Sequence, residues 1–479
     1  MRLRFAPSPT GFLHIGNART AVINHILSQK ENATLVLRIE DTDLERSSAQ
    51  SEESIREDLR WLGIEWQEGP DTGGAYGPYR QSERFDIYRT YTDRLLEDGR
   101  AYRCYCTVEE LEKMKQKALA EGRNEFYDGR CRTLSAEEAA AHEADGRTYT
   151  IRFRVPDNGT ITLTDLIKGT VTFESANIGG DFIIVRSDGV PVYNYIVVID
   201  DSLMQITHVV RGEDHLSNTP KQLLIAQALG FSPPHYAHMP LVMGDDRKKL
   251  SKRHGITSVA LYRKEGYLPE ALYNYIAMLG WSLESGDEIA EKRDINTHFR
   301  LDRLGGSAAI FDFKKLKWMN GLYIRSKTAE ELYDLFHPYA REAGYDFDSY
   351  NRNDILTLLS TLKRYCDLLG DIGEYLPVFL DDTVQYPDDV RKTIQSDDGR
   401  AVVRAALSLF GTVLTPENFS QDAVNRISEK TGLKGKSLFM SSRAVITGRL
   451  HGPDLAEMMQ AMGYDRCVSR IRQADSISG

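Results

Sequence analysis

Residues 1–17 read MRLRFAPSPTGFLHIGN, and this stretch decides how the rest of the chain is interpreted. Leu3 and Phe5 alternate with two arginines in the two-residue period of a short strand, and the prolines and glycine that follow cannot continue it. From about His14 onward, apolar residues recur at the three- and four-residue spacing of a helix with one apolar face. The stretch therefore predicts a strand, a loop and a helix.

His14 and Asn17 stand three residues apart at the expected start of this helix, and therefore on one face. The first N–H groups of a helix lack partners and lie at the positive end of its dipole, so a phosphate binds there readily. Taken alone the motif is weak, because an ordinary strand, loop and helix with one surface histidine would look the same.

A second motif is the run DDRKKLSKRHG at residues 245–255, in which Ser251 stands beside Lys252 among many basic residues. Such a run is usually a solvated face. However, HIGN after an N-terminal strand, together with a distant KLSKR, resembles the paired signatures of class I aminoacyl-tRNA synthetases. The preceding RFAPSPTG narrows the resemblance to glutamyl-tRNA synthetases of the bacterial type. Their glutaminyl relatives usually carry a proline where this chain has Ala6.

The resemblance implies an α/β fold with a class I, Rossmann-like nucleotide-binding domain, an α+β insertion and an all-α C-terminal anticodon-binding domain. It also implies ATP-dependent ligation of L-glutamate to tRNA(Glu) through glutamyl-adenylate, with Mg²⁺ accompanying ATP. Charging of tRNA(Gln) as well stays open. The expected divisions are the catalytic domain at 1–100 and 190–254, the insertion that holds the tRNA acceptor end at 101–189, a stem-contact region at 255–327 and the helical domain at 328–479.

Patterning along the chain agrees with this organisation. Strand-like and helix-like segments alternate up to about residue 100 and again from about 190, as in a doubly wound sheet. Between 147 and 189, short strand patterns are separated by Gly, Asn and Asp turns, and from 328 the pattern is almost wholly helical.

The resemblance assigns site residues in three groups. The catalytic group is His14, Asn17 and Lys252. The ATP-binding group is Pro7, Ser8, Thr10, Gly11, His14, Gly16, Asn17, Lys249, Leu250, Ser251, Lys252 and Arg253. The glutamate-binding group is Arg4, Ala6, Ser8, Glu40, Tyr193 and Arg211.

Three of these residues also have a physical rationale. A planar guanidinium suits a carboxylate, so Arg4 and Arg211 are candidates to grip an acidic side chain. Glu40 follows a second predicted strand at 34–38, where the carboxyl end of the strand would turn it toward a bound ammonium group. The alternatives stay open: each arginine could be an ordinary ion-paired residue, and Glu40 and its acidic neighbours could cap a helix over 45–62.

Five cysteines, an odd number, argue against a disulfide framework and agree with a reducing compartment. The spacing of Cys104, Cys106 and Cys131 is similar to the three-cysteine part of a zinc-binding pattern in some family members. Their fourth ligand is expected near position 133, where Thr133 is a poor ligand. Tyr127 or His142 could substitute, and reduced, buried thiols without metal are the alternative. No metal ligand set is therefore assigned.

Composition sets wide limits on the class of protein. A chain of 479 residues, 41% of them hydrophobic, is long enough for about three domains with buried cores. No apolar run of membrane-spanning length and no signal-peptide pattern occur, so we expect a cytoplasmic monomer without a membrane partner. The net charge of −10 is unusual for an RNA-binding protein, so a local basic groove would have to meet the phosphates.

Other functions fit parts of the sequence. A small-molecule nucleotidyltransferase or a shorter tRNA-modifying relative would explain only the first domain, and a non-enzymatic RNA-binding scaffold would need neither His14 nor Lys252. Within the family, an arginine associated with strict tRNA(Glu) specificity is expected shortly before Thr361. This chain has Leu358 and Leu359 there, which favours relaxed specificity.

Overall fold

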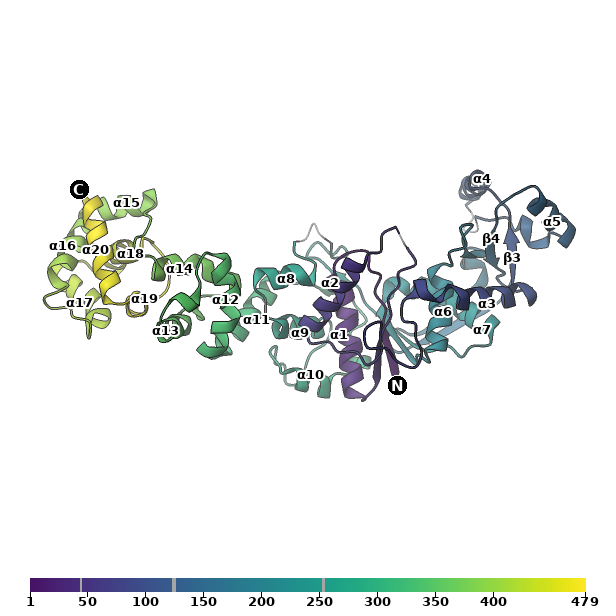
Figure 1. The fold of residues 1–479 in the computed structure, drawn as a ribbon, viewed down its shortest axis with the longest axis horizontal. Helices are drawn as coiled ribbons and strands as arrows, with labels where there is room; N and C mark the ends of the chain where they lie inside the picture. The colour runs from purple at the N-terminus through teal and green to yellow at the C-terminus, as the bar shows by residue number, and fades with distance from the viewer. Residues whose placement is uncertain (44, 123–125, 252–254) are drawn as a thin grey trace. The chain divides into compact units, whose positions relative to one another are not determined.

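A computed structural model gives the fold and describes residues 1–43, 45–122, 126–251 and 255–479 (Figure 1). The chain divides into two compact units: the first contains Met1–Tyr262 and Leu272–Asp312, and the second contains Arg263–Ala271 and Phe313–Gly479. Within the described ranges, no helix combines the length and the apolar character needed to cross a bilayer.

The first unit is built from strands and helices that alternate along much of the chain. Its strands are β1 Arg2–Phe5, β2 Thr34–Leu37, β3 Ala101–Cys104, β4 Thr150–Phe153, β5 Thr160–Asp165, β6 Gly169–Glu174, β7 Phe182–Val185, β8 His208–Gly212, β9 His235–Met239, β10 Val242–Met243 and β11 Ala309–Ile310. Its helices are α1 Ile15–Lys30, α2 Ala49–Trp61, α3 Phe85–Glu97, α4 Val108–Ala120, α5 Ala136–Ala144, α6 Tyr193–Leu203, α7 Thr219–Leu229 and α10 Lys292–His298, while α8 Val259–Glu265 and α9 Pro269–Ala277 have residues in both units.

The strands that organise the first unit are mostly parallel. β8 and β9 pair in parallel with Arg211 opposite His238, and β5 joins β9 in parallel at Asp165. β1 and β2 form a second parallel pair, and the N–H of Thr207, just before β8, donates to the carbonyl of Arg2 at 3.0 Å. The carboxyl ends of β1, β8 and β9 therefore lie on one side, where α/β sheets bind their ligands.

The predicted strand, loop and helix at the N-terminus are confirmed. β1 ends at Phe5, and α1 begins after His14, whose extended backbone (φ −79°, ψ 149°) is that of an N-cap residue. The predicted apolar face of α1 is fully buried: Ile15, Ala18, Ala21, Val22 and Ile26 have no exposed surface.

The start of the second helix differs from the prediction. α2 begins at Ala49 rather than at residue 45, and the side chain of Ser48 caps it. Capping by the preceding acidic residues is therefore wrong. Asp43 instead accepts a hydrogen bond from Nε of Arg46 at 2.6 Å, and Asp41 accepts from the N–H and the hydroxyl of Ser82 at 2.8 Å and 2.6 Å.

The segment predicted to be an insertion shares a core with the rest of the first unit. Its strands β3, β4 and β7 form an antiparallel sheet. Phe153 and Ile184 of this sheet pack in one buried cluster with Ile196 of α6 and Ile225 of α7. The β5–β6 hairpin of the same segment belongs to the sheet that contains β8 and β9. The segment is thus built into the unit that carries the main sheet.

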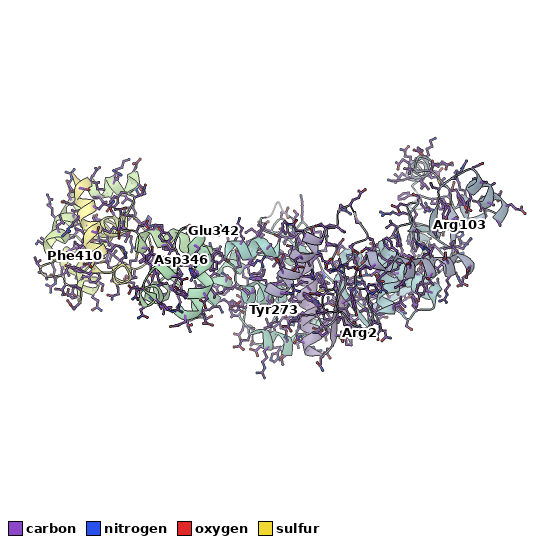
Figure 2. The ribbon with its side chains drawn as sticks, in the orientation of Figure 1. Arg2, Arg103, Tyr273, Glu342, Asp346 and Phe410 are labelled. Atoms are coloured by element: carbon purple, nitrogen blue, oxygen red, sulfur yellow. The ribbon has the colours of Figure 1, made fainter. Side chains whose placement is uncertain are left out.

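The second unit is helical, as predicted for the C-terminal part of the chain, and Figure 1 colours it green to yellow. One buried core runs through it, and the ring of Phe410, labelled in Figure 2, lies 6.4 Å from Phe419 and 5.7 Å from Tyr464 between centroids. Its helices are α11 Phe313–Ser326, α12 Ala329–Glu342, α13 Arg352–Leu362, α14 Ile372–Leu380, α15 Asp388–Gln395, α16 Asp397–Leu409, α17 Phe419–Thr431, α18 Gly435–Thr447, α19 Leu455–Met462 and α20 Tyr464–Ser478.

A buried carboxylate joins α6 to α3 and the turn before it. Asp200 is fully buried and accepts hydrogen bonds from Nε of Arg84 at 2.7 Å, from Nε2 of Gln81 at 2.8 Å and from the hydroxyl of Tyr88 at 2.9 Å. Arg84 is itself almost completely buried. Each charge is therefore tolerated in the interior because the other is present.

Replacing Asp200 with alanine would leave Arg84 buried without its anion. We expect the free energy of unfolding to fall by about 3–5 kcal/mol, measured as a lower urea midpoint for the first unit. Asp86→Ala on α3, where the carboxylate is exposed, is the matched control and should shift the midpoint little. Equal shifts for the two variants would contradict this role.

Candidate active site

The N-terminus of α1 places His14 beside the backbone N–H groups of the first helical turn. Nδ1 of His14 accepts a hydrogen bond from the N–H of Gly16 at 3.2 Å, so the ring proton of the neutral imidazole is on Nε2. The first turn of α1 contains no acidic residue. This helix end is therefore positive and suited to an anion.

The chain that follows the basic run lies against the same helix end. The N–H of Ile15 donates to the carbonyl of Thr257 at 2.9 Å, and the N–H of Val259 donates to the carbonyl of Leu13 at 3.0 Å. These backbone hydrogen bonds bring residues 257–259 beside the predicted phosphate site, although they are far from it in sequence.

A cavity of about 680 Å³ opens between these segments and the strand ends. Predicted residues that line it are Arg4, Ala6, Pro7, Ser8, His14, Gly16, Asn17, Glu40, Tyr193, Arg211, Lys249, Leu250 and Ser251. Further lining residues are Phe5, Arg19, Thr20, Gly212, Asp214, His215, Met239, Pro240, Leu241 and Val242. The cavity therefore joins the predicted ATP and glutamate groups into one space.

Four predicted residues are not among those that line the cavity. Thr10 and Gly11 belong to the loop before α1 but do not reach its wall. Lys252 and Arg253 lie outside the described residues. Lys249, Leu250 and Ser251, which directly precede these two residues in the sequence, line the cavity.

One side of the cavity rests on a buried network of charges. Asp201 accepts hydrogen bonds from Nε of Arg4 at 3.3 Å and from Nη1 of Arg38 at 2.8 Å, and Nη2 of Arg38 lies 3.6 Å from Glu40. Burial alone would raise the pKa of Asp201, but the charges of Arg38 and Arg4 hold this pKa below its ordinary value. Burial raises the pKa of Glu40 to about 7 against the opposing charges of the same two arginines.

Arg211 lies within β8 rather than after it, and its guanidinium is held on two sides. Nη2 donates to Thr219 at 2.9 Å and to Gln222 at 2.8 Å, and Nε donates to Nε2 of His238 at 3.1 Å. Nη1 is buried and has no hydrogen-bond partner among the described residues. An unpaired guanidinium N–H is costly in the interior, so this group calls for an acceptor from a ligand.

Sequence reasoning missed several polar residues of the cavity. Nδ1 of His215 lies 3.2 Å from the hydroxyl of Tyr193, and burial followed by the charge of Arg211 lowers the pKa of His215 to about 4. Asp214 accepts a hydrogen bond from Nζ of Lys249 at 2.9 Å. The signal that could have found His215 and Asp214 is their place in the run RGEDH, directly after the predicted Arg211.

Arg19 was also missed, because it lies on the predicted apolar face of the first helix. It is buried, lines the cavity, and donates from Nη2 to the carbonyl of Leu279 at 2.8 Å. Burial lowers the pKa of Arg19 to about 10. It fastens α1 to the chain that carries Leu279.

A separate group of thiols lies at β3. The Sγ atoms of Cys104, Cys106 and Cys131 all lie within 4.8 Å of one another, and no further histidine, cysteine or carboxylate of the described residues joins them. The hydroxyl of Tyr127 lies 3.6 Å from Sγ of Cys104 and accepts from the N–H of Cys131 at 3.0 Å. His142 instead packs on Tyr105, with 5.0 Å between ring centroids.

Comparison with known families gives two matches. The sequence model of a family described as tRNA synthetases class I (E and Q), catalytic domain, matches residues 1–318. A second, described as anticodon binding domain, matches residues 331–475. The first covers every residue of the cavity, and the second lies within the helical unit.

The chain is also similar to individual proteins over its whole length. It is 46% identical to a glutamate–tRNA ligase of Heliobacterium modesticaldum, with 100% of this chain and 97% of the relative aligned. It is 46% identical to a glutamate–tRNA ligase of a Sulfurihydrogenibium species, with 98% of each aligned. A crystal structure of a glutamate tRNA ligase from Elizabethkingia meningosepticum in complex with its amino acid is 32% identical, with a TM-score of 0.87 and 99% of each chain covered.

The raised pKa of Glu40 predicts a pH-dependent cost to stability. Between the ordinary pKa of 4.5 and about 7, the folded protein holds a proton on Glu40 that the unfolded chain has lost, so wild-type stability falls as the pH rises through this window. The free energy of unfolding of Glu40→Gln, relative to that of wild type, should therefore rise by on the order of 2 kcal/mol between pH 5 and pH 8. Urea unfolding at both pH values measures this difference.

Glu57→Gln, on the exposed side of α2, is the control for removing a carboxylate and should show no such pH-dependent gain. If wild type and Glu40→Gln change in parallel with pH, Glu40 does not titrate in this window.

Proposed function

The chain belongs to the glutamate–tRNA ligases among the class I aminoacyl-tRNA synthetases, and we propose that its cavity activates L-glutamate with ATP and passes the glutamyl group to tRNA(Glu). Class I synthetases use ATP, and the catalytic-domain match covers the cavity. The observation that carries the proposal is the buried, unpaired Nη1 of Arg211 in the wall of the same cavity that α1 enters with its N-terminus.

Arg211 is proposed to bind the side-chain carboxylate of glutamate. Its Nη1 needs an acceptor, and no carboxylate of the described residues is ion-paired with it, so its charge is available for an anion. Arg4 has Asp201 as its partner and contributes a weaker pull on the same carboxylate. Glu40 and the hydroxyl of Tyr193 are proposed to meet the ammonium group of the substrate.

The triphosphate of ATP is proposed to lie at the start of α1. The proposed donors for its oxygens are Nε2–H of His14 and the backbone N–H of Asn17, while the N–H of Gly16 is held by Nδ1 of His14. Lys249 and Ser251 line the same cavity, and Lys252 with Arg253, outside the described residues, are proposed to reach the same phosphates. Mg²⁺, when bound with ATP, would neutralise phosphate charge and take its ligands mainly from phosphates and water.

The chemistry needs no covalent protein nucleophile. An oxygen of the glutamate α-carboxylate attacks the α-phosphorus of ATP, the bond to the bridging oxygen breaks and pyrophosphate leaves. A ribose hydroxyl of the terminal adenosine of tRNA then attacks the acyl carbon, and AMP leaves. The residues of this chain act by placing donors around the phosphorus as negative charge gathers there, which is worth on the order of 3 kcal/mol per donor.

The choice of tRNA stays partly open. The helical unit carries the anticodon-binding match, which supports tRNA(Glu) as a partner. Leu358 and Leu359, where an arginine was expected, are both buried in the core. The exposed neighbours on α13 are Thr357 and Ser360. The two leucines therefore say little about which tRNA is accepted. An assay that compares the charging of purified tRNA(Gln) with that of tRNA(Glu) decides whether the protein also uses tRNA(Gln). The cytoplasmic location and the monomeric state stay predictions.

The three thiols at β3 are proposed to hold zinc together with Tyr127. Zinc prefers thiolates and a closed site of four ligands, and the tyrosine oxygen is the polar atom that lies against the sulfurs. When bound, the ion would cross-link β3 to the turn Arg130–Thr133 without a chemical role in the cavity. His142 does not belong to the thiol group.

ATP–pyrophosphate exchange tests the main proposal. We expect exchange that requires both glutamate and tRNA(Glu). His14→Asn, which keeps a capping side chain for α1 but removes the imidazole, should lower the exchange rate by about a hundredfold. His235→Asn, at an exposed histidine of β9, is the matched control. Exchange without glutamate would favour a small-molecule nucleotidyltransferase, and RNA binding without exchange would favour a scaffold.

Metal analysis tests the zinc proposal. The purified protein should contain about one zinc per chain, and Cys131→Ser should lose it together with thermal stability. Tyr127→Phe keeps the ring and should bind zinc more weakly, as measured by competition with a chelator. Cys366→Ser, at a buried cysteine of the helical unit, should keep its zinc. Metal-free protein with all thiols reactive would rule the site out.

A further inference from the structure

Three buried residues on adjacent strands form a line that ends at the cavity. Asp165 is the last residue of β5, His238 is on β9, and Arg211 is on β8. Oδ2 of Asp165 lies 2.6 Å from Nδ1 of His238, and Nε2 of His238 lies 3.1 Å from Nε of Arg211. Both side chains behind Arg211 are fully buried, so the line is shielded from water.

The hydrogen bonds fix which nitrogen of His238 carries the proton. A guanidinium can only donate, so Nε2 of His238 must accept from Arg211. The ring proton is then on Nδ1 and points at Asp165. Burial lowers the pKa of His238, the bond to Asp165 works against this, and Arg211 lowers it further, so the ring is neutral. The hydroxyl of Thr219 also lies 3.2 Å from Nε2, but it donates its proton to the carbonyl of His215 and so leaves the lone pair of Nε2 to Arg211.

Asp165 can impose this tautomer because its carboxylate is held in place by backbone N–H groups, among them that of His238, which lies 3.2 Å from Oδ1 and 3.1 Å from Oδ2. Oδ1 accepts from the N–H groups of Ile167 and Lys168, both at 2.9 Å, and so holds the β5–β6 turn. Oδ2 faces the ring of His238. The backbone donors and the ring help to keep the carboxyl ionised, and they hold its pKa below the ordinary value despite burial.

We propose that Asp165 and His238 are positioning residues for glutamate recognition: they fix Nε of Arg211 so that its Nη1 is left for the substrate carboxylate. This rests on the proposed function of Arg211. The same turn also holds a second wall of the cavity, because Lys168 pairs with Glu213, and Glu213 accepts from the N–H of Leu241 at 3.0 Å.

Asp165→Asn separates this role from a structural one. The amide oxygen can keep the turn, while the amide N–H₂ replaces Oδ2 opposite His238 and drives the ring proton to Nε2. That proton then meets Nε–H of Arg211, so the guanidinium keeps the bonds from Nη2 to Thr219 and Gln222 but loses the bond that fixes Nε. We expect the KM for glutamate to rise about tenfold, with the KM for ATP within about twofold of wild type. Glu174→Gln, an exposed carboxylate on β6, is the control.

A second background tests the path through the ring. His238→Gln retains an oxygen that can accept from Arg211 but has no tautomer for Asp165 to control, so adding Asp165→Asn should change the glutamate KM by less than about twofold. In ¹⁵N-histidine NMR, His238 of wild type should be protonated on Nδ1, and Asp165→Asn should move the proton to Nε2. Its signal is identified by its loss in His238→Gln.

Arg211→Lys in the same assays separates this inference from the function beneath it. If that variant leaves the glutamate KM unchanged, the proposed pocket is wrong and the inference falls with it. If Arg211→Lys raises the glutamate KM but Asp165→Asn does not, only the inference is overturned. A joint rise of the glutamate and ATP KM values in Asp165→Asn, or an equal effect with and without His238, would show a structural role and also overturn it.

Discussion

Asp201 of α6 is the carboxylate on which the geometry of the cavity depends, because it is paired with two buried arginines that belong to different segments of the chain. Arg4 at the end of β1 and Arg38 just after β2 both donate to it, and neither could remain in the interior without a counter-charge. The strand ends, and Glu40 beyond them, are thereby held in place. Arg211 on β8 is outside this ion-pair network, which leaves its charge for a ligand.

Features that depend on neighbours within a few residues could be predicted from the sequence. The strand, loop and helix at the N-terminus follow from local periodicity and from prolines that cannot continue a strand, and the capping position of His14 follows from where the helix must begin. The Asp165–His238–Arg211 line could not be found in this way. Its members are neighbours only because β5, β9 and β8 lie in that order in the sheet, and no local pattern encodes strand order.

Errors arose where the surroundings of a side chain decide its role. The acidic residues before α2 looked like caps, but Ser48 is nearer the true start of the helix and caps it. Leu358 and Leu359 were compared with an RNA-facing arginine, although both are core residues of α13. Tyr127 was one of two candidates for a fourth ligand; it is only four residues from Cys131, but the fold is needed to bring its hydroxyl to Cys104, 23 residues away. Burial is a property of the folded chain and is hard to assign from composition.

The cap of α1 is an imidazole, and the first turn of that helix carries no acidic residue, so its positive end has no negative neighbour from its own turn. A polyanion bound there would contribute the missing charge to the helix. Ligands that bind only the folded chain raise its resistance to unfolding by mass action. A polyanion that binds this helix end would therefore raise the free energy of unfolding, by an amount that grows with its concentration.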